Sequence, residues 1–166
     1  MDKKEMGRTM SINYPFKPKS NRYLVPGQFW TIPLDNSKFA CGRVIETDPN
    51  SRRGFLAGLM DWIGDNPPMA ENLKGCKTLI QIDVHIKTIH ETALDGFISG
   101  YRSLELDGIE TEYFTSQMVH DENCMLMKGY SVLRQATKEE ADTYDQFGYA
   151  GYMMIKCYAE DLLANK

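Results

Sequence analysis

Histidine and acidic side chains recur along this chain in a pattern that could hold a metal ion. Imidazole nitrogens and carboxylate oxygens are zinc ligands, and a bound zinc ion generates hydroxide near neutral pH, which would suit hydrolysis. The candidate catalytic residues are Asp83, His85, His90 and Glu91, and the candidate ligands of a divalent metal such as zinc are Asp83, His85, His90, His120 and Asp121. The alternative interpretation places Asp83 and His85 on the solvent face of a half-buried strand. Because the chain has only three histidines and no HExxH motif, we expect no catalytic site and no cofactor.

The cysteines indicate neither a zinc site nor a disulfide framework. Cys41, Cys76, Cys124 and Cys157 form no CxxC pair, and their intervals fit no familiar metal or disulfide spacing. Cys124 follows His120 by four residues, so an imidazole could activate this thiol as a nucleophile. Cys41 and Cys157 fall within predicted core elements, which favours small buried side chains. We expect reduced thiols in a cytoplasmic protein, since the sequence shows no apolar signal segment and no run long enough to span a membrane.

The charge of the chain is unevenly distributed. The formal net charge is −4, and residues 1–22 carry six basic and two acidic side chains, a net +4, which leaves −8 on residues 23–166. Nucleic-acid binding is not expected, because it requires a basic surface that neutralises phosphates. An acidic body is either an ordinary soluble surface or a surface that meets a basic partner, where opposite fields speed encounter. The candidate partner-binding residues lie in the acidic connector, residues 105–123: Asp107, Glu110, Glu112, Asp121 and Glu122.

The first half of the chain reads as β-strands. Residues 28–34 are rich in aromatic and β-branched side chains, a polar turn follows, and residues 39–46 return as a second strand, which predicts a β-hairpin. Gly42 within the second strand predicts a bulge or a close approach of another backbone. Residues 54–63 form a short apolar run, and its glycines favour a strand over a helix.

Further strands and a helix are predicted in the second half. Residues 78–86 alternate apolar and polar side chains, so one face of this strand belongs to a core and the other is polar. Residues 96–104 and 125–133 also read as strands. Thr137 is followed three residues later by a glutamate, a capping box that predicts the start of the C-terminal helix.

These elements predict an α+β, mostly β fold. It has five to six short antiparallel strands in a small barrel-like or strongly curved sheet, capped by the C-terminal helix, since closure would remove exposed sheet edges. Residues 1–22, with two prolines and no regular period, are expected to form a basic flexible tail. Residues 23–166 are expected to form a single β-rich domain.

The predicted hairpin resembles the opening of the immunity protein 26 family. That family's pattern is a glycine, an aromatic residue, Ile-Pro-Leu, a turn, a second aromatic residue and Gly-Arg-Val. The matching residues are Gly27, Phe29, Ile32-Pro33-Leu34, Phe39 and Gly42-Arg43-Val44. Arg43 is either an anion ligand or, as we expect, a structural arginine whose guanidinium bonds a carboxylate or backbone carbonyls.

The resemblance implies a bacterial immunity protein that binds and neutralises a cognate toxin encoded beside it. The toxin would be a basic protein, since this chain is acidic, and neither nucleic acid nor membrane would be a partner. Members of the same family also carry a phosphotriesterase-like label, which implies as the alternative a metal-dependent hydrolase acting on organophosphate triesters. The hairpin residues look like scaffold and favour neither activity.

Overall fold

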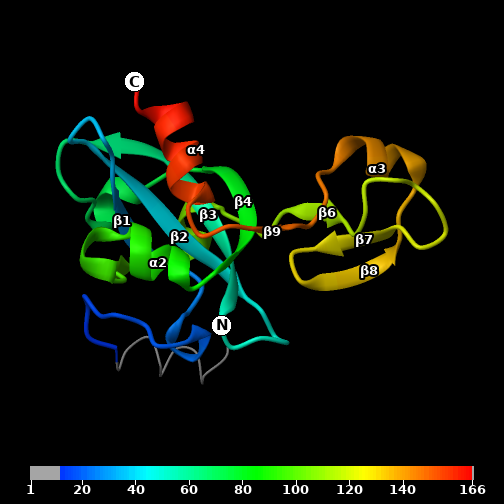
Figure 1. The fold of residues 1–166 in the computed structure, drawn as a ribbon, viewed down its shortest axis with the longest axis horizontal. Helices are drawn as coiled ribbons and strands as arrows, with labels where there is room; N and C mark the ends of the chain where they lie inside the picture. The colour runs from blue at the N-terminus through cyan, green and yellow to red at the C-terminus, as the bar shows by residue number, and fades with distance from the viewer. Residues whose placement is uncertain (1–11, 166) are drawn as a thin grey trace.

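The computed structural model describes residues 12–165, which contain a six-stranded sheet and a smaller three-stranded sheet (Figure 1). The strand order is β5-β1-β2-β3-β4-β9 in the larger sheet and β6-β7-β8 in the smaller one. The strands are β1 Gln28–Pro33, β2 Phe39–Thr47, β3 Gly54–Gly64, β4 Thr78–His85, β5 Gly100–Tyr101, β6 Tyr113–Thr115, β7 Met125–Lys128, β8 Ser131–Gln135 and β9 Tyr149–Ala150. The α-helices are α2 Lys87–Thr92, α3 Lys138–Thr143 and α4 Met154–Leu163, and the 3-10 helices are η1 Asn21–Tyr23, η2 Ala70–Leu73, η3 Leu94–Gly96 and η4 Leu104–Asp107.

The smaller sheet and α3 form a lobe, residues 113–147, that extends from the body built around the larger sheet (Figure 1). Residues 108–112 lead into the lobe, and β9 returns the chain to the edge of the body beside β4. The core of the lobe is small, with Cys124, Leu126 and Ala136 buried.

The three central strands, β1 to β3, are buried along most of their length because both faces of the larger sheet are covered. On one face, Trp30 and Phe55 pack in a cluster that includes Ile155 of α4. On the other face, Phe29 and Leu56 pack in a separate cluster with residues of η2 and the link to the lobe. A sheet covered on both faces needs apolar side chains at successive positions. This explains why residues 54–60 form a continuous apolar run instead of alternating.

The predicted hairpin is confirmed by antiparallel pairing of β1 with β2, in which Trp30 lies opposite Gly42. The register of β2 against β3 shifts between Ala40 and Gly42, so the predicted bulge is present. The close neighbour of Gly42 is a side chain, not a backbone: a Cβ on this residue would lie 2.2 Å from the Trp30 ring. Any larger residue here would push the indole out of the core.

The prediction of a small antiparallel barrel is wrong, because the larger sheet is open and mixed. Its two edge strands, β5 and β9, have two residues each, and β9 runs parallel to β4. Such short edges offer no ladder along which a barrel could close. The mostly β composition and the C-terminal helix, α4, are confirmed.

Two other element predictions need correction. Of residues 96–104, only Gly100–Tyr101 form a strand. Residues 125–133 form two strands and not one, since the chain turns at Gly129, whose φ is +53°.

The capping box is confirmed: the Glu140 N–H donates to Thr137 Oγ1 at 3.1 Å and the Thr137 N–H donates to Glu140 Oε1 at 2.9 Å. The helix that it starts, α3, ends at Thr143, and the C-terminal helix α4 is separate.

Residues 12–22 pack on the body and do not form a tail. Phe16 forms an antiparallel bridge with Ile98. The amide of Asn21, a buried residue, donates to the carbonyls of Ser51 at 2.6 Å and Gly54 at 2.8 Å. The rest of the predicted tail, residues 1–11, lies outside the described residues.

Candidate interaction site

Asp107, the first of the predicted contact residues, lies inside the body and not on its surface. Its side chain is fully buried and bonds Arg43 Nη1 at 2.9 Å, while Arg102 donates to both carboxylate oxygens at 2.9 Å. Burial acts to raise the pKa of Asp107, but the hydrogen bonds from Arg102, the Gly75 N–H and Arg43 outweigh it and lower the pKa to about 2. Asp107 is therefore a structural anchor that is charged at neutral pH.

Arg43 is the structural arginine that we expected. Its side chain is fully buried beneath η4. Besides Asp107, it donates to the carbonyl oxygens of Arg102 at 2.5 Å and Ser103 at 3.1 Å. The Gly-Arg-Val part of the hairpin motif thus fastens η4 and its flanking loop to the larger sheet. The Arg43 nitrogens that donate to Asp107 and to these two carbonyls are buried, so Arg43 acts as scaffold.

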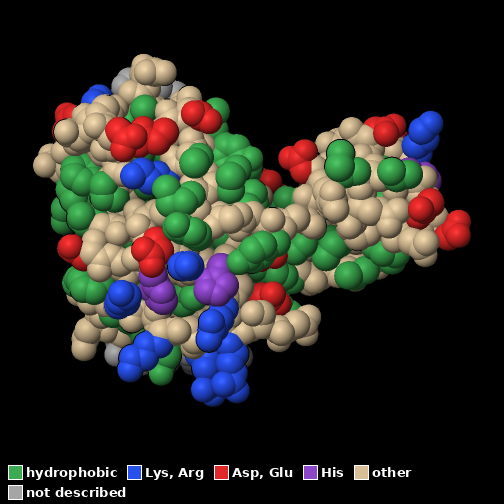
Figure 2. Space-filling model, in the orientation of Figure 1, with side chains coloured by type: hydrophobic (Ala, Val, Ile, Leu, Met, Phe, Trp, Pro, Cys, Tyr) green, Lys and Arg blue, Asp and Glu red, His purple; other side chains and the backbone are tan. Residues whose placement is uncertain are grey.

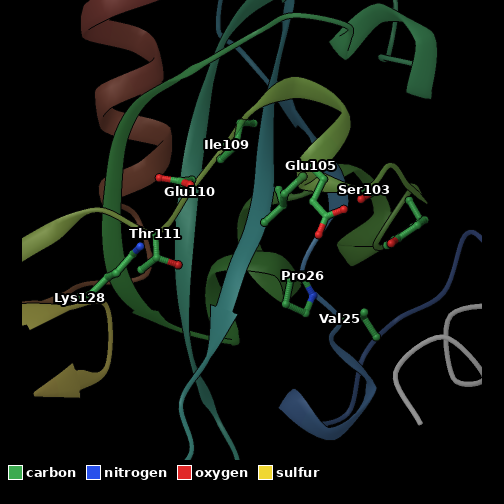
Figure 3. Close-up of a pocket in the computed structure, with 10 residues that line it drawn as sticks. Val25, Pro26, Ser103, Glu105, Ile109, Glu110, Thr111 and Lys128 are labelled. Atoms are coloured by element: carbon green, nitrogen blue, oxygen red, sulfur yellow. The ribbon is translucent and has the colours of Figure 1, made fainter. Parts of the chain in front are cut away.

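Glu110 lies on the surface, on the wall of a shallow pocket of about 330 Å³ between the body and the lobe. Figure 3 shows Lys128 reaching from the lobe toward Thr111, and Glu105 lying on the opposite side near Pro26. The pocket combines two carboxylates with one lysine. It is therefore electrostatically mixed and gives no clear preference for a charged partner.

Glu112 faces a different space, a cleft of about 460 Å³ between β4 and the lobe. The acidic residues on its walls are Glu112, Asp83 and Asp145, and aromatic side chains, including Phe114 and Phe147, form much of the rest. Figure 2 shows a notch between body and lobe with acidic side chains along its margin. We call this concave space the acidic cleft. Its walls are aromatic, and the charged side chains that line it, Asp83, Glu112 and Asp145, are all acidic.

The floor of the acidic cleft is held by polar side chains of β4. The Gln81 amide donates to the Glu110 carbonyl at 2.8 Å and accepts from the Glu112 N–H at 2.9 Å. The Tyr130 hydroxyl donates to Asp83 Oδ1 at 2.5 Å. The lobe and residues 108–112 therefore cover the polar face of β4. Where water is excluded, the side chains of this face are the hydrogen-bond partners for the polar groups that cover it.

The carboxylates of the acidic cleft differ from Asp107 in their electrostatics. Burial raises the pKa of Asp83, the Tyr130 hydrogen bond partly opposes this, and Asp48 adds to the rise. Burial and the nearby Asp145 raise the pKa of Glu112, against a hydrogen bond from Thr78. Neither Asp83 nor Glu112 has an ion pair within residues 12–165. Negative charge in the acidic cleft is thus uncompensated.

Asp121 and Glu122 lie apart from the acidic cleft, in the exposed loop between β6 and β7. Asp121 Oδ1 accepts from the Asn123 N–H at 2.7 Å and from Gln117 Nε2 at 2.9 Å. This carboxylate therefore shapes its own loop. The predicted acidic connector is not one surface: it contributes a buried anchor, two separate pocket walls and a loop at the far side of the lobe.

The candidate metal ligands are likewise dispersed. His85, His90 and Glu91 line one cavity, while Asp83 faces the acidic cleft. His120 bonds the Ala136 carbonyl through Nε2 at 3.0 Å, in the lobe beside Asp121. Among the described residues, no group of three or more His, Cys, Asp or Glu side chains is arranged to hold a metal. Phosphotriester hydrolysis therefore stays a prediction from the resemblance alone.

The four cysteines lie in different environments. Burial raises the pKa of Cys41, which lies in the core of β2, and the pKa of Cys76. Cys124 is buried in the lobe, where its thiol bonds the Gln117 carbonyl, and His120 bonds a different carbonyl. Cys157, predicted to be buried, is exposed on α4. The possible pairing of the Cys124 thiol with the His120 imidazole is not formed, since each side chain bonds a different carbonyl.

Sequence reasoning missed Asp145, Tyr130 and Gln81. Asp145 fell within a predicted helix, and Tyr130 fell within a predicted strand that turned out to be a hairpin. An isolated glycine inside a strand-like run usually indicates a bulge or a close backbone approach, so Gly129 by itself did not reveal the hairpin that presents Tyr130. No local signal places Asp145 next to Glu112, because the two residues are brought together only by the return of the chain to β6, where Thr115 bonds the Asp145 carbonyl at 3.0 Å.

No helix in the described part of the chain is long and apolar enough to cross a membrane.

The comparisons with known proteins give one match, and it agrees with the hairpin motif. No curated protein and no solved structure matches the chain. The family model described as Immunity protein 26 matches residues 25–117, a span that begins at the hairpin, includes the Arg43–Asp107 anchor and ends just after β6. Since this match covers more than half of the sequence, the chain belongs to the Immunity protein 26 family.

Proposed function

We propose that this protein neutralises a cognate toxin domain by binding it, and that the acidic cleft is part of the contact surface. Membership in an immunity protein family supports the first statement. The observation that carries the second is the pair of carboxylates Asp83 and Glu112, whose pKa values are raised and which lack a cationic partner in residues 12–165. We infer that the complex forms in the cytoplasm, where the free cysteines stay reduced.

A basic side chain of the toxin would supply the missing positive charge. A carboxylate whose pKa is raised by burial and by a neighbouring carboxylate is destabilised in its charged form. A lysine or arginine that enters the acidic cleft would relieve this repulsion, and close charge pairs at interfaces have coupling energies of about 1.5–7 kcal/mol. Binding is therefore expected to tighten as pH rises through the titration of these two acids.

The aromatic walls of the acidic cleft suit the insertion of one side chain from the toxin. Phe147 lies edge-on to both Phe114 and Tyr130, with ring centroids 5.2 Å apart in each pair. Rings that are fixed in this way form a rigid apolar surface beside the carboxylates. Interface hot spots are enriched in arginine because its guanidinium stacks on aromatic faces while it bonds carboxylates. The expected toxin residue is an arginine on a basic surface.

The test is charge reversal in the acidic cleft, measured with the toxin domain encoded beside this chain. The double variant Glu112→Lys, Asp145→Lys should weaken the toxin complex by about 100-fold at physiological salt, which corresponds to ~2.7 kcal/mol. Isothermal titration calorimetry at two stated ionic strengths measures the loss. Survival of cells that express the toxin with each variant provides a second readout.

The matched control is Asp121→Lys, Glu122→Lys, which changes the net charge equally but in the loop at the far side of the lobe. It should alter the affinity less than about threefold, because rim charges act mainly on the association rate. The milder pair Glu112→Gln, Asp145→Asn guards against misfolding. The placement of the contact surface is wrong if both cleft variants bind the toxin as tightly as the control does. The immunity role itself is wrong if the unaltered chain binds no toxin.

A further inference from the structure

Another cavity, of about 640 Å³, shares Tyr149 of β9 with the acidic cleft and has the opposite charge. It is formed where β4 ends and α2 begins, and its cationic side chains are Lys19, Arg53 and Lys87. Figure 2 shows histidine side chains lying among Lys and Arg side chains on this part of the surface. Its volume is within the range of small-molecule sites, about 300–1,000 Å³.

The positive charge of this cavity is not neutralised by the protein. Lys19, Arg53 and Lys87 are exposed, and none of them has an ion pair in residues 12–165. Glu91 is the one carboxylate among the residues that line the cavity. Three cations and one carboxylate give a net +2 before the histidines are considered. A phosphate monoester carries about −1.5 to −2 near neutral pH, so the two charges match.

His85 adds a neutral hydrogen-bond donor. Its Nδ1 accepts the Lys87 backbone N–H at 2.9 Å, so the neutral ring must carry its proton on Nε2. Burial lowers the pKa of His85, and Arg53, His90 and Lys87 lower it further. Because Nδ1 is an acceptor in this hydrogen bond, the proton of the neutral ring lies on Nε2, and Nε2–H, which has no partner among the described residues, can donate to an anionic oxygen. His90 is held differently, by a contact between its Nε2 and the Pro18 carbonyl.

Two tyrosine side chains also line this cavity. Lys87 Nζ lies 5.1 Å from the centroid of the Tyr152 ring, a cation–π contact that positions the ammonium group. Tyr149 lines the same cavity and is 65 % exposed. An exposed ring beside a cluster of cations can stack with a planar organic group while the cations hold a phosphate, as in nucleotide recognition.

We propose that this cavity binds a small phosphate monoester with a planar organic group, such as a nucleoside monophosphate. Arg53 and Lys19 bind the phosphate oxygens, His85 Nε2–H donates to one of them, and Tyr149 stacks on the planar group. This site and the acidic cleft share Tyr149 but no charged side chain, and the proposal does not depend on toxin binding.

Isothermal titration calorimetry of the full chain with AMP tests the proposal. AMP should bind saturably in the micromolar to low millimolar range, and inorganic phosphate should bind more weakly because it does not stack. The variant Lys19→Gln, Arg53→Gln should weaken AMP binding at least tenfold. The matched control Lys74→Gln, Lys138→Gln removes two exposed lysines elsewhere and should change it less than twofold. Thermal melting should be the same for both variants, since all four side chains are exposed.

Four results would overturn the proposal. One is the absence of saturable AMP binding. Another is an equal loss in the control variant, which would indicate general attraction to a cationic surface. A third is adenosine binding as tightly as AMP, since the phosphate would then contribute nothing. The last is tighter binding of a short oligonucleotide without terminal phosphates, which would assign the cavity to phosphodiesters.

Discussion

Two regions of this protein use carboxylates from neighbouring parts of the chain in opposite ways. Asp107, the last residue of η4, is buried, bonds Arg43 and Arg102 and has its pKa lowered to about 2. Glu112, five residues later, faces the acidic cleft without a cation and has a raised pKa. Asp107 therefore stabilises the fold in its charged form, whereas Glu112 is destabilised in its charged form and available to a partner. Measurements of stability can separate these two roles.

Asp107→Ala should destabilise the body most. The substitution leaves the fully buried Arg43 guanidinium without its carboxylate, and breaking a buried ion pair from one side costs about 3–5 kcal/mol. Urea unfolding followed by circular dichroism measures the change in the free energy of unfolding. Glu105→Ala, an exposed acidic residue of the same 3-10 helix, is the control and should cost less than about 0.5 kcal/mol.

Asp107 should also make the free energy of unfolding depend on pH under acidic conditions. Because the folded-state pKa of Asp107 lies below the ordinary value of 3.8, its contribution to stability is complete above that value and is lost as pH falls toward about 2. The difference in stability between the Asp107→Ala variant and the unaltered chain should therefore be largest above pH 4 and should shrink as pH falls to 2. A difference that stays constant over this range would contradict an ionised role for Asp107.

Arg102→Ala should cost less than Asp107→Ala. It removes hydrogen bonds to a charged group, but the Arg102 side chain is 16 % exposed and Arg43 still pairs with the carboxylate. The measurement is again urea unfolding. If Arg102→Ala were as damaging as Asp107→Ala, the anchor would depend on the outer arginine and not on the buried one.

Tyr130→Phe should cost about 1 kcal/mol, since it removes one hydrogen bond to a half-buried carboxylate. The hydroxyl of Tyr130 lowers the pKa of Asp83, so its loss should raise that pKa further. Carboxyl-detected NMR titration of Asp83 measures the shift. An unchanged Asp83 titration would show that the lobe does not control the charge of the acidic cleft.

Glu112→Gln should have the smallest effect and the opposite sign. Because the pKa of Glu112 is raised in the folded protein, its ionisation lowers stability as pH rises above about 4.5. The neutral variant should therefore be more stable than the unaltered chain at pH 7, by no more than about 0.5 kcal/mol. A stable variant that binds toxin poorly would show that this carboxylate serves recognition, while a clear loss of stability would make it structural like Asp107.

How far the sequence could predict the fold depended on the distance between the residues involved. The hairpin of residues 28–46 and the Thr137–Glu140 capping box are local, and both are present as expected. The parallel pairing of β4 with β9 joins residues more than sixty positions apart and has no local signal. The barrel prediction failed for this reason: strand periodicity shows which face is buried, but not which strands form the edges.

The candidate site divides in the same way. Residue types and spacing were sufficient to identify Arg43 as a structural arginine and the connector as acidic, because these are properties of a single strand or segment. Only the tertiary structure placed Asp107 inside, Glu112 beside Asp145 in the acidic cleft, and His85 among cations in a different cavity. The physical reason is that the free energy of a charge depends on its burial and on its neighbours in space, and the order of residues along the chain specifies neither.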